Sequence, residues 1–484
     1  MNIMTNPQFS IKQYFQESNG DFEIFRKKLF EKGVMLKHYP EEKLFLVYHK
    51  YEVPVTDDLG RECRSLVISE TGEIKSYSCM IPLLNKEGLQ YMDDHKNEKQ
   101  IITTCYEGTY LSVFYDNNKW FVSTRRCLDS NESYFNQTNS HYNMFLDTLK
   151  VAGYDSLDSF TDKLNKTLSY YFVLIHHMNK HIIDYSSIFD PEYMRLCLTA
   201  VRDSTMAELD NYSDIVSFAS YDTNSVIFIP NKMESLTQFE EEQKLSEVPT
   251  CEGVVVKVFN STTNLYNLIK LQTFSYQYAL AMGSDKNIFK GLVFLYQHNK
   301  LIDYFSGNNS QHVKKIVNPL NTTESYDTVG VIDSVFKVCT SELFELFKLL
   351  YDVKTGKHIN PNLYKILSKE YKNIMFGVKG IYYKKRAVLH NSTEKLADIR
   401  VTHLKISDVY NYLKSIPTDT FISFLQMRKL MFNWVRMNDD DMTVTTSFVD
   451  FSTISKSCDK VHLKLTAIFT NKLFPNIMPT DVPK

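Results

Sequence analysis

Apolar residues follow two different spacings along the chain, and the change between them divides the sequence. Up to about residue 283, short segments such as KLFLVYHKYEV (43–53), SYYFVLIH (169–176) and CEGVVVKVF (251–259) alternate apolar and polar positions or form brief apolar runs. Such segments predict β-strands. From about residue 284, apolar residues recur at i, i+3, i+4 and i+7, as in SELFELFKLLYDV (341–353), which is typical of helices. The patterns predict an α+β unit over residues 1–283 and a mostly helical unit over 284–484.

Several elements follow from the local pattern. Helices are expected over residues 8–33, 140–165, 404–416 and 419–437, and two strands with a tight turn over 63–78. The segment ITTCYEGTYLSVFYDNNKWFVSTRR (102–126) predicts a β-meander, with a hairpin turn at residues 116–118 because Asn tolerates positive φ. The acidic segment at 237–248 predicts a solvated helix or loop, and the run at 438–441 predicts a solvated loop.

Charge and composition exclude some classes of protein. The chain has 55 Lys and Arg against 57 Asp and Glu, so a net charge of -2 excludes a generally basic binder but allows a local basic groove. Apolar residues make up 43% of the chain, enough for each unit to bury a core. The many Tyr, Phe, Asn and Lys residues indicate an AT-rich genome, for which a large DNA virus or phage is a candidate source.

Cysteine spacing and targeting signals set the expected compartment. The eight cysteines include no CxxC pair, which favours free thiols in a reducing compartment. The HHMNKH segment (176–181) has no Cys or carboxylate at ligand spacing and predicts a polar turn, so no metal site is expected. The first residues do not resemble a signal peptide, and no apolar run approaches about 20 residues. We therefore expect a cytoplasmic protein without membrane contact, in the host cytoplasm or virion if the source is viral.

Five short elements occur in a fixed order in the first unit: ECRSLVIS, CYEGTYLSVFY with KWFVSTRR, YYFVLIHHMNKHIIDY, CEGVVVKV and LIKLQTFSY. Together they resemble the covalent nucleotidyltransferases, and most closely the phage-type ATP-dependent single-strand RNA ligases. The motifs cover about residues 35–283, and the helical tail is similar only in architecture. The resemblance implies an ATP-grasp-like adenylylation domain of α+β class with antiparallel sheets, followed by a mostly α-helical C-terminal domain.

The family's chemistry implies roles for the matched positions. A lysine attacks the α-phosphate of ATP, AMP passes to an RNA 5′-phosphate, and Mg²⁺ with further cationic side chains neutralises the phosphoryl oxygens. The nucleophile motif, K-x-D-G, becomes Cys105-Tyr106-Glu107-Gly108 here. The matched nucleotide-binding candidates are Arg64, Glu107, Gly108, Glu252 and Lys270, and Lys257 is a candidate for a displaced lysine on a neighbouring strand.

Four polar positions of the expected pocket are lost. Cys105 replaces the nucleophilic lysine, Pro82 a phosphate-binding lysine, Val173 a ribose-binding glutamate, and Gln272 the second lysine of the last motif. An unperturbed thiol has a pKa of about 8.5 and is mostly protonated at neutral pH. On a strand, Cys105 fits a small buried hydrophobe better than a nucleophile. The joint loss indicates decay of one catalytic site.

Basic positions outside this pocket are candidates for RNA contact. Arg125 and Arg126 fit a phosphate-binding patch or a surface role equally well. Lys384, Lys385 and Arg386 lie in a tyrosine-containing basic segment that begins at Lys379 and continues to Arg400 and Lys405, where cations neutralise phosphates and rings stack on bases. A solvated basic face explains this segment equally well.

The sequence favours an RNA-ligase-like pseudoenzyme that has lost autoadenylylation and acts as a nucleic-acid-binding or scaffolding component, within a virus-encoded complex if the source is viral. RNA and protein partners are both expected, and ATP binding without reaction stays open. Two alternatives remain: an active ATP-dependent RNA ligase that uses a displaced lysine with ATP and Mg²⁺, and a capping-type guanylyltransferase. The latter ranks lower because no all-β tail pattern follows Lys270.

Overall fold

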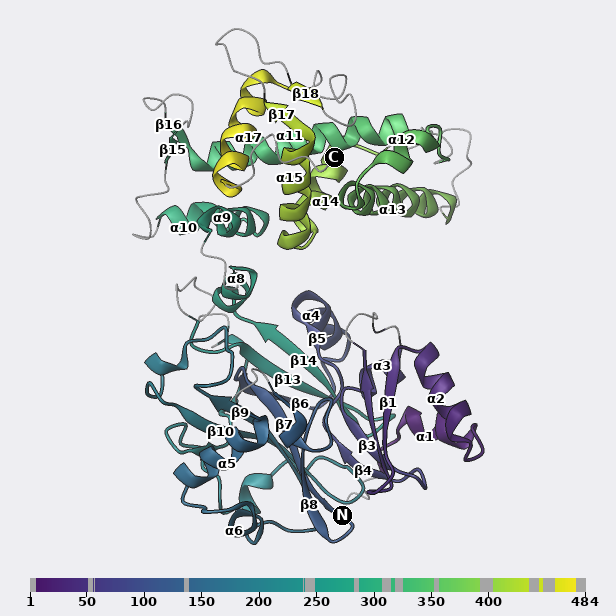
Figure 1. Cartoon of the computed structure of the whole chain (residues 1–484), viewed down its shortest axis with the longest axis vertical. Coiled ribbons are helices and arrows are strands. Elements are labelled where there is room, and N and C mark those ends of the chain that lie inside the picture. The colour runs from purple at the N-terminus through teal and green to yellow at the C-terminus, as the bar shows by residue number, and fades with distance from the viewer. Residues whose placement is uncertain are drawn as a thin grey trace. The chain divides into compact units, whose positions relative to one another are not determined.

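Figure 1 shows the computed structural model of the chain. It describes residues 6–475 except 51–54, 56, 135–138, 238, 240–248, 283–286, 307–314, 318–324, 352–356, 392–403, 435–443 and 447–457. Most of the acidic segment at 237–248 and the run at 438–441 therefore lie outside the described residues. The chain forms two compact units, residues 1–280 and 281–484, and each is described by itself.

The first unit begins with two helices and an antiparallel four-stranded sheet in the order β1-β2-β3-β4. The elements are α1 (Ser10–Gln16), α2 (Phe22–Glu31), β1 (Val34–Tyr39), β2 (Leu44–His49), α3 (Asp58–Glu62), β3 (Leu66–Ser69) and β4 (Ile74–Tyr77). The helical pattern predicted over 8–33 is confirmed, but it forms two helices, because Asn19 and Gly20 adopt φ of 50° and 76° and Asp21 caps the second one.

Two five-stranded sheets build the rest of this unit, in the orders β11-β10-β9-β7-β8 and β12-β6-β13-β14-β5. Their strands are β5 (Leu83–Leu84), β6 (Gln100–Cys105), β7 (Thr109–Asp116), β8 (Lys119–Thr124), β9 (Ser169–His176), β10 (Met194–Arg202), β11 (Ile227–Phe228), β12 (Lys232–Met233), β13 (Gly253–Asn260) and β14 (Leu265–Gln272). Neighbouring strands are antiparallel except β10–β11 and β14–β5. The predicted α+β class with antiparallel sheets is confirmed.

The predicted meander over 102–126 is only partly correct. β7 and β8 form the expected hairpin, with Asn117 and Asn118 at φ of 48° and 61°. β6, however, belongs to the other sheet, so the chain changes sheets between Cys105 and Thr109. Gly108 permits this crossing, because a Cβ there would lie 2.4 Å from the carbonyl oxygen of Leu174 on β9. Alternation of side chains cannot show such a change of sheet.

Short helices cover the sheets of the first unit: α4 (Asn85–Asp94), α5 (His141–Val151), α6 (Leu157–Thr161) and α8 (Phe274–Met282), with 3₁₀ turns η1 (Ser130–Glu132), η2 (Tyr185–Ser187) and η3 (Tyr212–Asp214). Met144, Phe145 and Phe160 pack with Phe172 of β9 in one apolar core. The predicted helix over 140–165 is interrupted, because Gly153 at φ 91° ends its first half.

The second unit is mostly helical, as predicted. It contains α9 (Ile288–Gln297), α10 (Leu301–Ser306), α11 (Thr328–Leu350), α12 (Pro361–Ile366), α13 (Lys369–Asn391), α14 (Ile406–Ser415), α15 (Thr418–Met431) and α17 (Lys460–Leu473), with two short strand pairs, β15 (Lys315–Val317) with β16 (Ser325–Asp327) and β17 (Phe432–Trp434) with β18 (Val444–Thr446). The helix expected over 419–437 therefore ends at Met431. A buried ion pair of Arg428 with Glu342 links α15 to α11, with nitrogen–oxygen distances of 2.7 and 2.5 Å.

Within the described part of the chain, no helix is both long and apolar enough to cross a membrane.

Candidate functional site

A cavity of about 290 Å³ is lined by strands from both five-stranded sheets of the first unit. All seven positions singled out for catalysis or nucleotide contact lie in its wall: Arg64, Cys105, Glu107, Gly108, Glu252, Lys257 and Lys270. Val173, where the resemblance places a lost glutamate, also lines it. The structure therefore brings the sequence motifs together at one place.

Strand register places Cys105 and the two lysines on one face of a sheet. Cys105 of β6 is opposite Gly253 of β13, and two residues further along, Val255 is opposite Lys270 of β14. Lys257 lies four residues beyond Gly253 on β13, about 13 Å along the strand. Because alternate residues face the same side, these side chains share the cavity face.

Glu252 is the centre of the polar contacts around Cys105. Its Oε2 accepts from Lys270 Nζ at 2.8 Å and from Cys105 Sγ at 3.4 Å, and its Oε1 accepts from Gln272 Nε2 at 3.2 Å. Asn85 orients Gln272 by accepting its backbone N–H at 2.9 Å. Burial opposes the charged form, but the Lys270 ammonium and these hydrogen bonds hold the pKa of Glu252 below its ordinary value. Both carboxylate oxygens are therefore engaged within the protein.

Cys105 is a buried, protonated thiol. Its side chain is 5% exposed, and burial raises its pKa to about 12, with the Glu252 carboxylate adding to the effect of burial and Lys270 opposing it. The thiolate is the nucleophilic form of cysteine. At neutral pH this residue therefore has the chemistry of a small hydrophobe.

Glu107 anchors a loop of the protein. Its carboxylate accepts the backbone N–H groups of Ile182 and Ile183 at 2.8 and 3.0 Å, and its own N–H donates to Tyr185 Oη at 2.7 Å. Burial raises the pKa of Glu107 despite these bonds. The carboxylate thus connects the turn after β9 to Glu107 and Gly108, where the chain passes from one sheet to the other.

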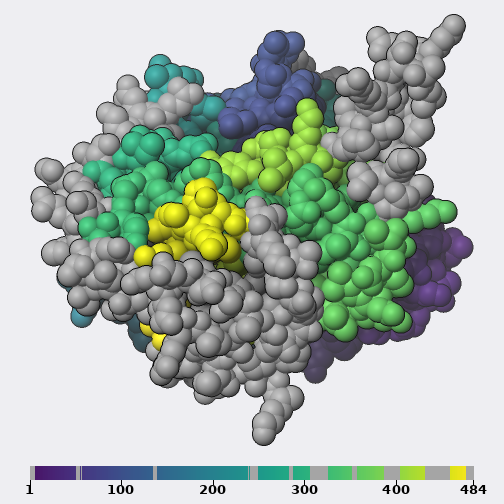
Figure 2. Space-filling model, turned by 90° about the horizontal axis from the view of Figure 1, so that it is seen from above, coloured from purple at the N-terminus to yellow at the C-terminus, as the bar shows by residue number. Residues whose placement is uncertain are grey.

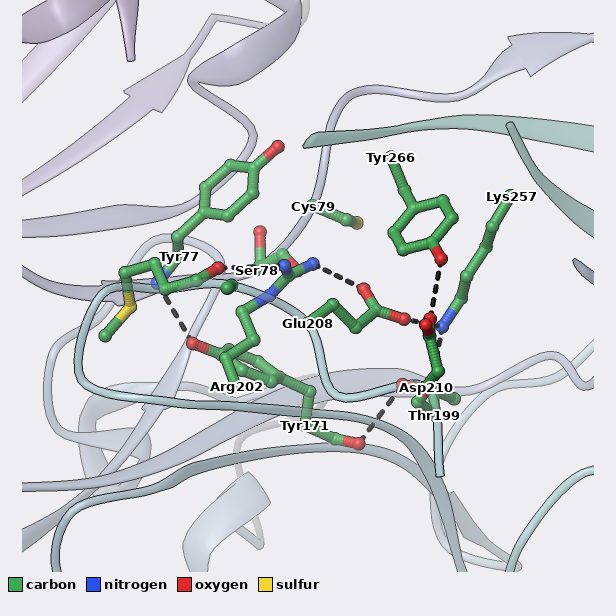
Figure 3. A network of polar contacts seen from close by, with 12 residues as sticks. Tyr77, Ser78, Cys79, Tyr171, Thr199, Arg202, Glu208, Asp210, Lys257 and Tyr266 are labelled. Atoms are coloured by element: carbon green, nitrogen blue, oxygen red, sulfur yellow. Dashed lines mark hydrogen bonds and ion pairs between the residues drawn. The ribbon is translucent and has the colours of Figure 1, made fainter. Parts of the chain in front are cut away.

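A second polar network, shown in Figure 3, joins the cavity wall at Lys257 to Arg202. Lys257 Nζ donates to the carbonyl oxygen of Thr199 at 2.8 Å and forms an ion pair with Glu208 Oε1. Glu208 Oε2 pairs with Arg202 Nη2 at 2.8 Å, and the same Nη2 donates to the carbonyl oxygen of Ser78 at 3.2 Å. The three charged side chains are all 10% exposed or less.

Sequence reasoning missed Arg202, Glu208 and Ser78. Thr199 lies at a β-bulge in β10, where the register shifts between Leu198 and Ala200. Bulges re-aim backbone groups locally, and no residue pattern in LCLTAVRD marks one. The Arg-x₅-Glu spacing is also an unremarkable surface-loop pattern, so no usable signal was present.

Two polar atoms in the cavity wall lack a partner among the described residues. Arg202 Nε and Ser78 Oγ are buried, in side chains that are 2% and 0% exposed. Nearby, Arg64 Nη1 donates to Cys79 Sγ at 3.0 Å, and its guanidinium lies 5.0 Å from the Tyr110 ring centre. A thiol is a weak acceptor. This part of the wall therefore fits a ligand rich in hydrogen-bond acceptors, such as a phosphate.

The donor set of the cavity does not fit Mg²⁺. Mg²⁺ usually binds through one or two carboxylates together with waters and substrate phosphates, and a cation beside a carboxylate oxygen repels it. Glu107, Glu208 and Glu252 all accept from protein N–H groups or cations in this arrangement. Within the described residues, no three His, Cys, Asp or Glu side chains are grouped to hold a metal ion.

The predicted RNA-contact residues lie elsewhere. Arg125 donates to the carbonyl oxygens of Arg64 at 3.3 Å and His49 at 3.2 Å, so it supports the chain beside Arg64. Arg126 is exposed, with its guanidinium 5.8 Å from the Tyr48 ring centre. The structure does not bring these residues to the cavity.

The other three predicted RNA contacts are on α13. Lys384 is exposed, whereas Lys385 forms an ion pair with Asp408 at 2.6 Å. The side chain of Arg386 lies outside the described residues.

The HHMNKH segment forms a turn at the end of β9. Asn179 Nδ2 donates to Thr109 Oγ1 at 2.8 Å, which ties the turn to β7. His176 is fully buried, and burial lowers its pKa to about 4. The segment is thus part of the structural frame around Glu107.

Comparisons with known proteins give structural neighbours only. No protein-family model matches the chain, and no curated protein matches it. A mutant RNA ligase of Naegleria gruberi solved with ATP and Mn is 14% identical, with a TM-score of 0.27 over 42% of this chain and 56% of that one. An archaeal ATP-dependent RNA ligase, form 2, is 13% identical, with a TM-score of 0.37 over 84% of this chain and 98% of that one. Its form 1 is 11% identical, with a TM-score of 0.36 over 96% and 99%.

These neighbours are ATP-dependent ligases at low identity. The chain spans little more than half of the Naegleria chain that it matches. TM-scores of 0.27 to 0.37 are too low to support a functional argument, so the proposal below is built on the cavity and the motifs.

Proposed function

We propose that this chain is an RNA-ligase-like protein that binds a nucleotide in the cavity but does not form a covalent nucleotidyl intermediate, and that it acts as a nucleic-acid-binding or scaffolding component. The observation that carries the proposal is the state of Cys105. At the position of the expected nucleophile stands a buried thiol with a pKa of about 12, hydrogen-bonded to Glu252.

Neither cavity lysine is prepared to replace the nucleophile. A nucleophilic lysine needs a lowered pKa, so that its amine is neutral. Burial by itself lowers the pKa of Lys270, but its pKa stays above the ordinary value, because the Glu252 carboxylate pairs with its ammonium. Lys257 is held by Glu208 and the Thr199 carbonyl, about 13 Å along β13 from the residue opposite Cys105. This arrangement disfavours an active ligase with a displaced lysine.

The cavity still favours a phosphate-bearing ligand. Its wall carries four cationic side chains, Arg64, Arg202, Lys257 and Lys270, against the three carboxylates of Glu107, Glu208 and Glu252. Arg202 Nε and Ser78 Oγ provide unused donors within that wall. ATP is the nucleotide that the motif resemblance implies, and no step through Mg²⁺ follows from these carboxylates.

The partners and setting of the protein belong to the same proposal. RNA fits the motif resemblance, and a near-neutral net charge of -2 suits protein partners as well. A viral or phage source and a cytoplasmic location stay predictions from composition.

Labelling of the purified full chain tests the proposal. The protein is incubated with α-labelled ATP or GTP and Mg²⁺, denatured, and examined for retained label, while unlabelled ATP is titrated in a thermal-shift assay. We expect no retained label and a rise in unfolding temperature with ATP, because a ligand that binds only the folded state stabilises it by RT ln(1+[L]/Kd).

Acid-labile, hydroxylamine-sensitive label would contradict the proposal. Lys257→Arg and Lys270→Arg variants would then identify the attacking lysine, with Lys119→Arg beyond the β7–β8 turn as a matched control. Labelling by GTP alone would favour the guanylyltransferase alternative.

A further inference from the structure

Helix α13 has two chemically different faces. Its buried face contains Tyr371, Ile374, Met375, Val378 and Tyr382, all 2% exposed or less. A second set lies at spacings of three, four, three and four residues: Lys369, Lys372, Phe376, Lys379 and Tyr383. Residues three and four apart are neighbours on a helix surface. These five side chains therefore form one continuous row, which we call the α13 stripe.

The α13 stripe offers aromatic surface between cations. Phe376 is 76% exposed and Tyr383 is 46% exposed, and the green region of Figure 2 that contains α13 lies at the surface. The stripe spans 14 residue steps, about 21 Å, and its two rings are seven residues, or about 10 Å, apart. No acidic residue occupies a stripe position.

The stripe lysines lie close to aromatic rings. Lys379 Nζ lies 4.6 Å from the Tyr351 ring centre and 5.6 Å from that of Tyr383. Lys372 Nζ lies 5.7 Å from the Tyr364 ring centre and donates to the carbonyl oxygen of Lys365 at 2.9 Å. No ion pair with a carboxylate is formed by Lys369, Lys372 or Lys379 within the described residues. Lys385, by contrast, is neutralised by Asp408.

We propose that the α13 stripe binds single-stranded nucleic acid. Phe376 and Tyr383 stack on bases, and the three lysines, Lys369, Lys372 and Lys379, neutralise phosphates. This inference deepens the nucleic-acid-binding role proposed above and rests on it. The stripe shares Lys379 and Tyr383 with the basic segment predicted from the sequence and adds Lys369, Lys372 and Phe376 from the preceding turns of the same helix.

Charge and shape select this partner. Cations without nearby carboxylates attract a polyanion, and flat rings on a convex helix match unpaired bases, whose faces are available for stacking. A bilayer surface would favour a wide aliphatic face. The stripe has Phe376 at its centre and Tyr383 at its C-terminal end, and no aliphatic residue.

Anisotropy measurements with a labelled, unstructured RNA oligonucleotide test the stripe in the full chain without added nucleotide. We expect Phe376→Leu to weaken binding about tenfold and Phe376→Tyr to preserve it, because stacking requires a ring rather than apolar area. Lys372→Gln with Lys379→Gln is expected to weaken binding and reduce its salt dependence. Lys348→Gln, an exposed lysine on α11, serves as the matched control.

Other outcomes overturn the assignment in distinguishable ways. Equal RNA binding by Phe376→Leu and the unchanged chain would show that this ring does not stack on a base and would overturn the stripe as a nucleic-acid site. Binding that survives all stripe substitutions but is lost in Arg64→Ala would place the RNA in the first unit. No RNA binding by the unchanged chain would also end the proposed nucleic-acid role, while the prediction for nucleotide labelling would stand.

Discussion

The cavity of the first unit and the α13 stripe of the second use cationic side chains in opposite ways. In the cavity, Lys270 and Lys257 each face a carboxylate that is buried with them. On the stripe, Lys372 and Lys379 are partly exposed and lie beside the rings of Tyr364 and Tyr351. A cation neutralised inside the protein stabilises or orients its partner, whereas a cation without a carboxylate neighbour is available to a ligand. Under the proposed function, the cavity cations hold the pocket around a non-covalently bound nucleotide, and the stripe cations are available to nucleic acid.

The same contrast appears between two buried carboxylates of the first unit. Glu252 has Lys270 beside it, and its pKa is held below the ordinary value although burial opposes this. Glu62 accepts the backbone N–H groups of Ser10 and Ile11, at 2.7 and 3.1 Å, and interacts with the Ser10 side chain, but burial raises its pKa to about 7. A neighbouring cation therefore decides which protonation state a buried carboxyl adopts.

The largest expected effect comes from removing the negative charge of Glu208, which pairs with two cations of the cavity wall. Glu208→Gln leaves Arg202 and Lys257 buried without a counter-ion, and we expect a loss of about 3–5 kcal/mol in the free energy of unfolding of the first unit. Chemical denaturation of the full chain measures it. Glu73→Gln, which breaks an exposed pair with Lys75, is the control and should cost about 1 kcal/mol or less. Equal losses in the two variants would mean that the cavity network is not structural.

The second expected effect is smaller and concerns how pH changes the stability that buried Glu62 contributes. Because the folded-state pKa of Glu62 is about 7, above its unfolded value of 4.5, the folded state binds the proton more tightly. Its stabilising contribution is complete below pH 4.5 and is lost as the pH rises through 7.

Glu62→Gln cannot titrate, so it isolates this contribution. Between about pH 5 and 8, the unchanged chain should lose about 2–3 kcal/mol of unfolding free energy relative to the variant. Denaturation curves at several pH values measure the difference. A difference that grows in the other direction would show that the Ser10 and Ile11 hydrogen bonds, rather than burial, control Glu62.

Local patterns predicted the elements better than their connections. The hairpin at Asn117 and Asn118 follows from turn chemistry alone. The change of sheet after Cys105 does not, because it depends on the close approach of Gly108 to β9, a contact between residues 66 apart in the chain.

The candidate site shows the same limit. The sequence motifs predicted seven site residues, and the fold brings all seven to one cavity. Glu208, the partner of Lys257, comes from another segment and has no motif of its own. Gln272 lies in the last motif, but the sequence shows it only as a lost lysine and not as a donor to Glu252. On α13, a run of basic residues suggested Lys385 as an RNA contact, but only the structure shows that Asp408 neutralises it.

The most direct test of the account is intact-protein mass spectrometry of the unchanged chain and Cys105→Lys after incubation with ATP and Mg²⁺. Because Glu252 is already occupied and the other lost positions stay lost, we expect neither protein to carry a nucleotidyl adduct. An adduct on Cys105→Lys alone would show that only the nucleophile is missing. An adduct on the unchanged chain would contradict the central claim that covalent chemistry has been lost from this cavity.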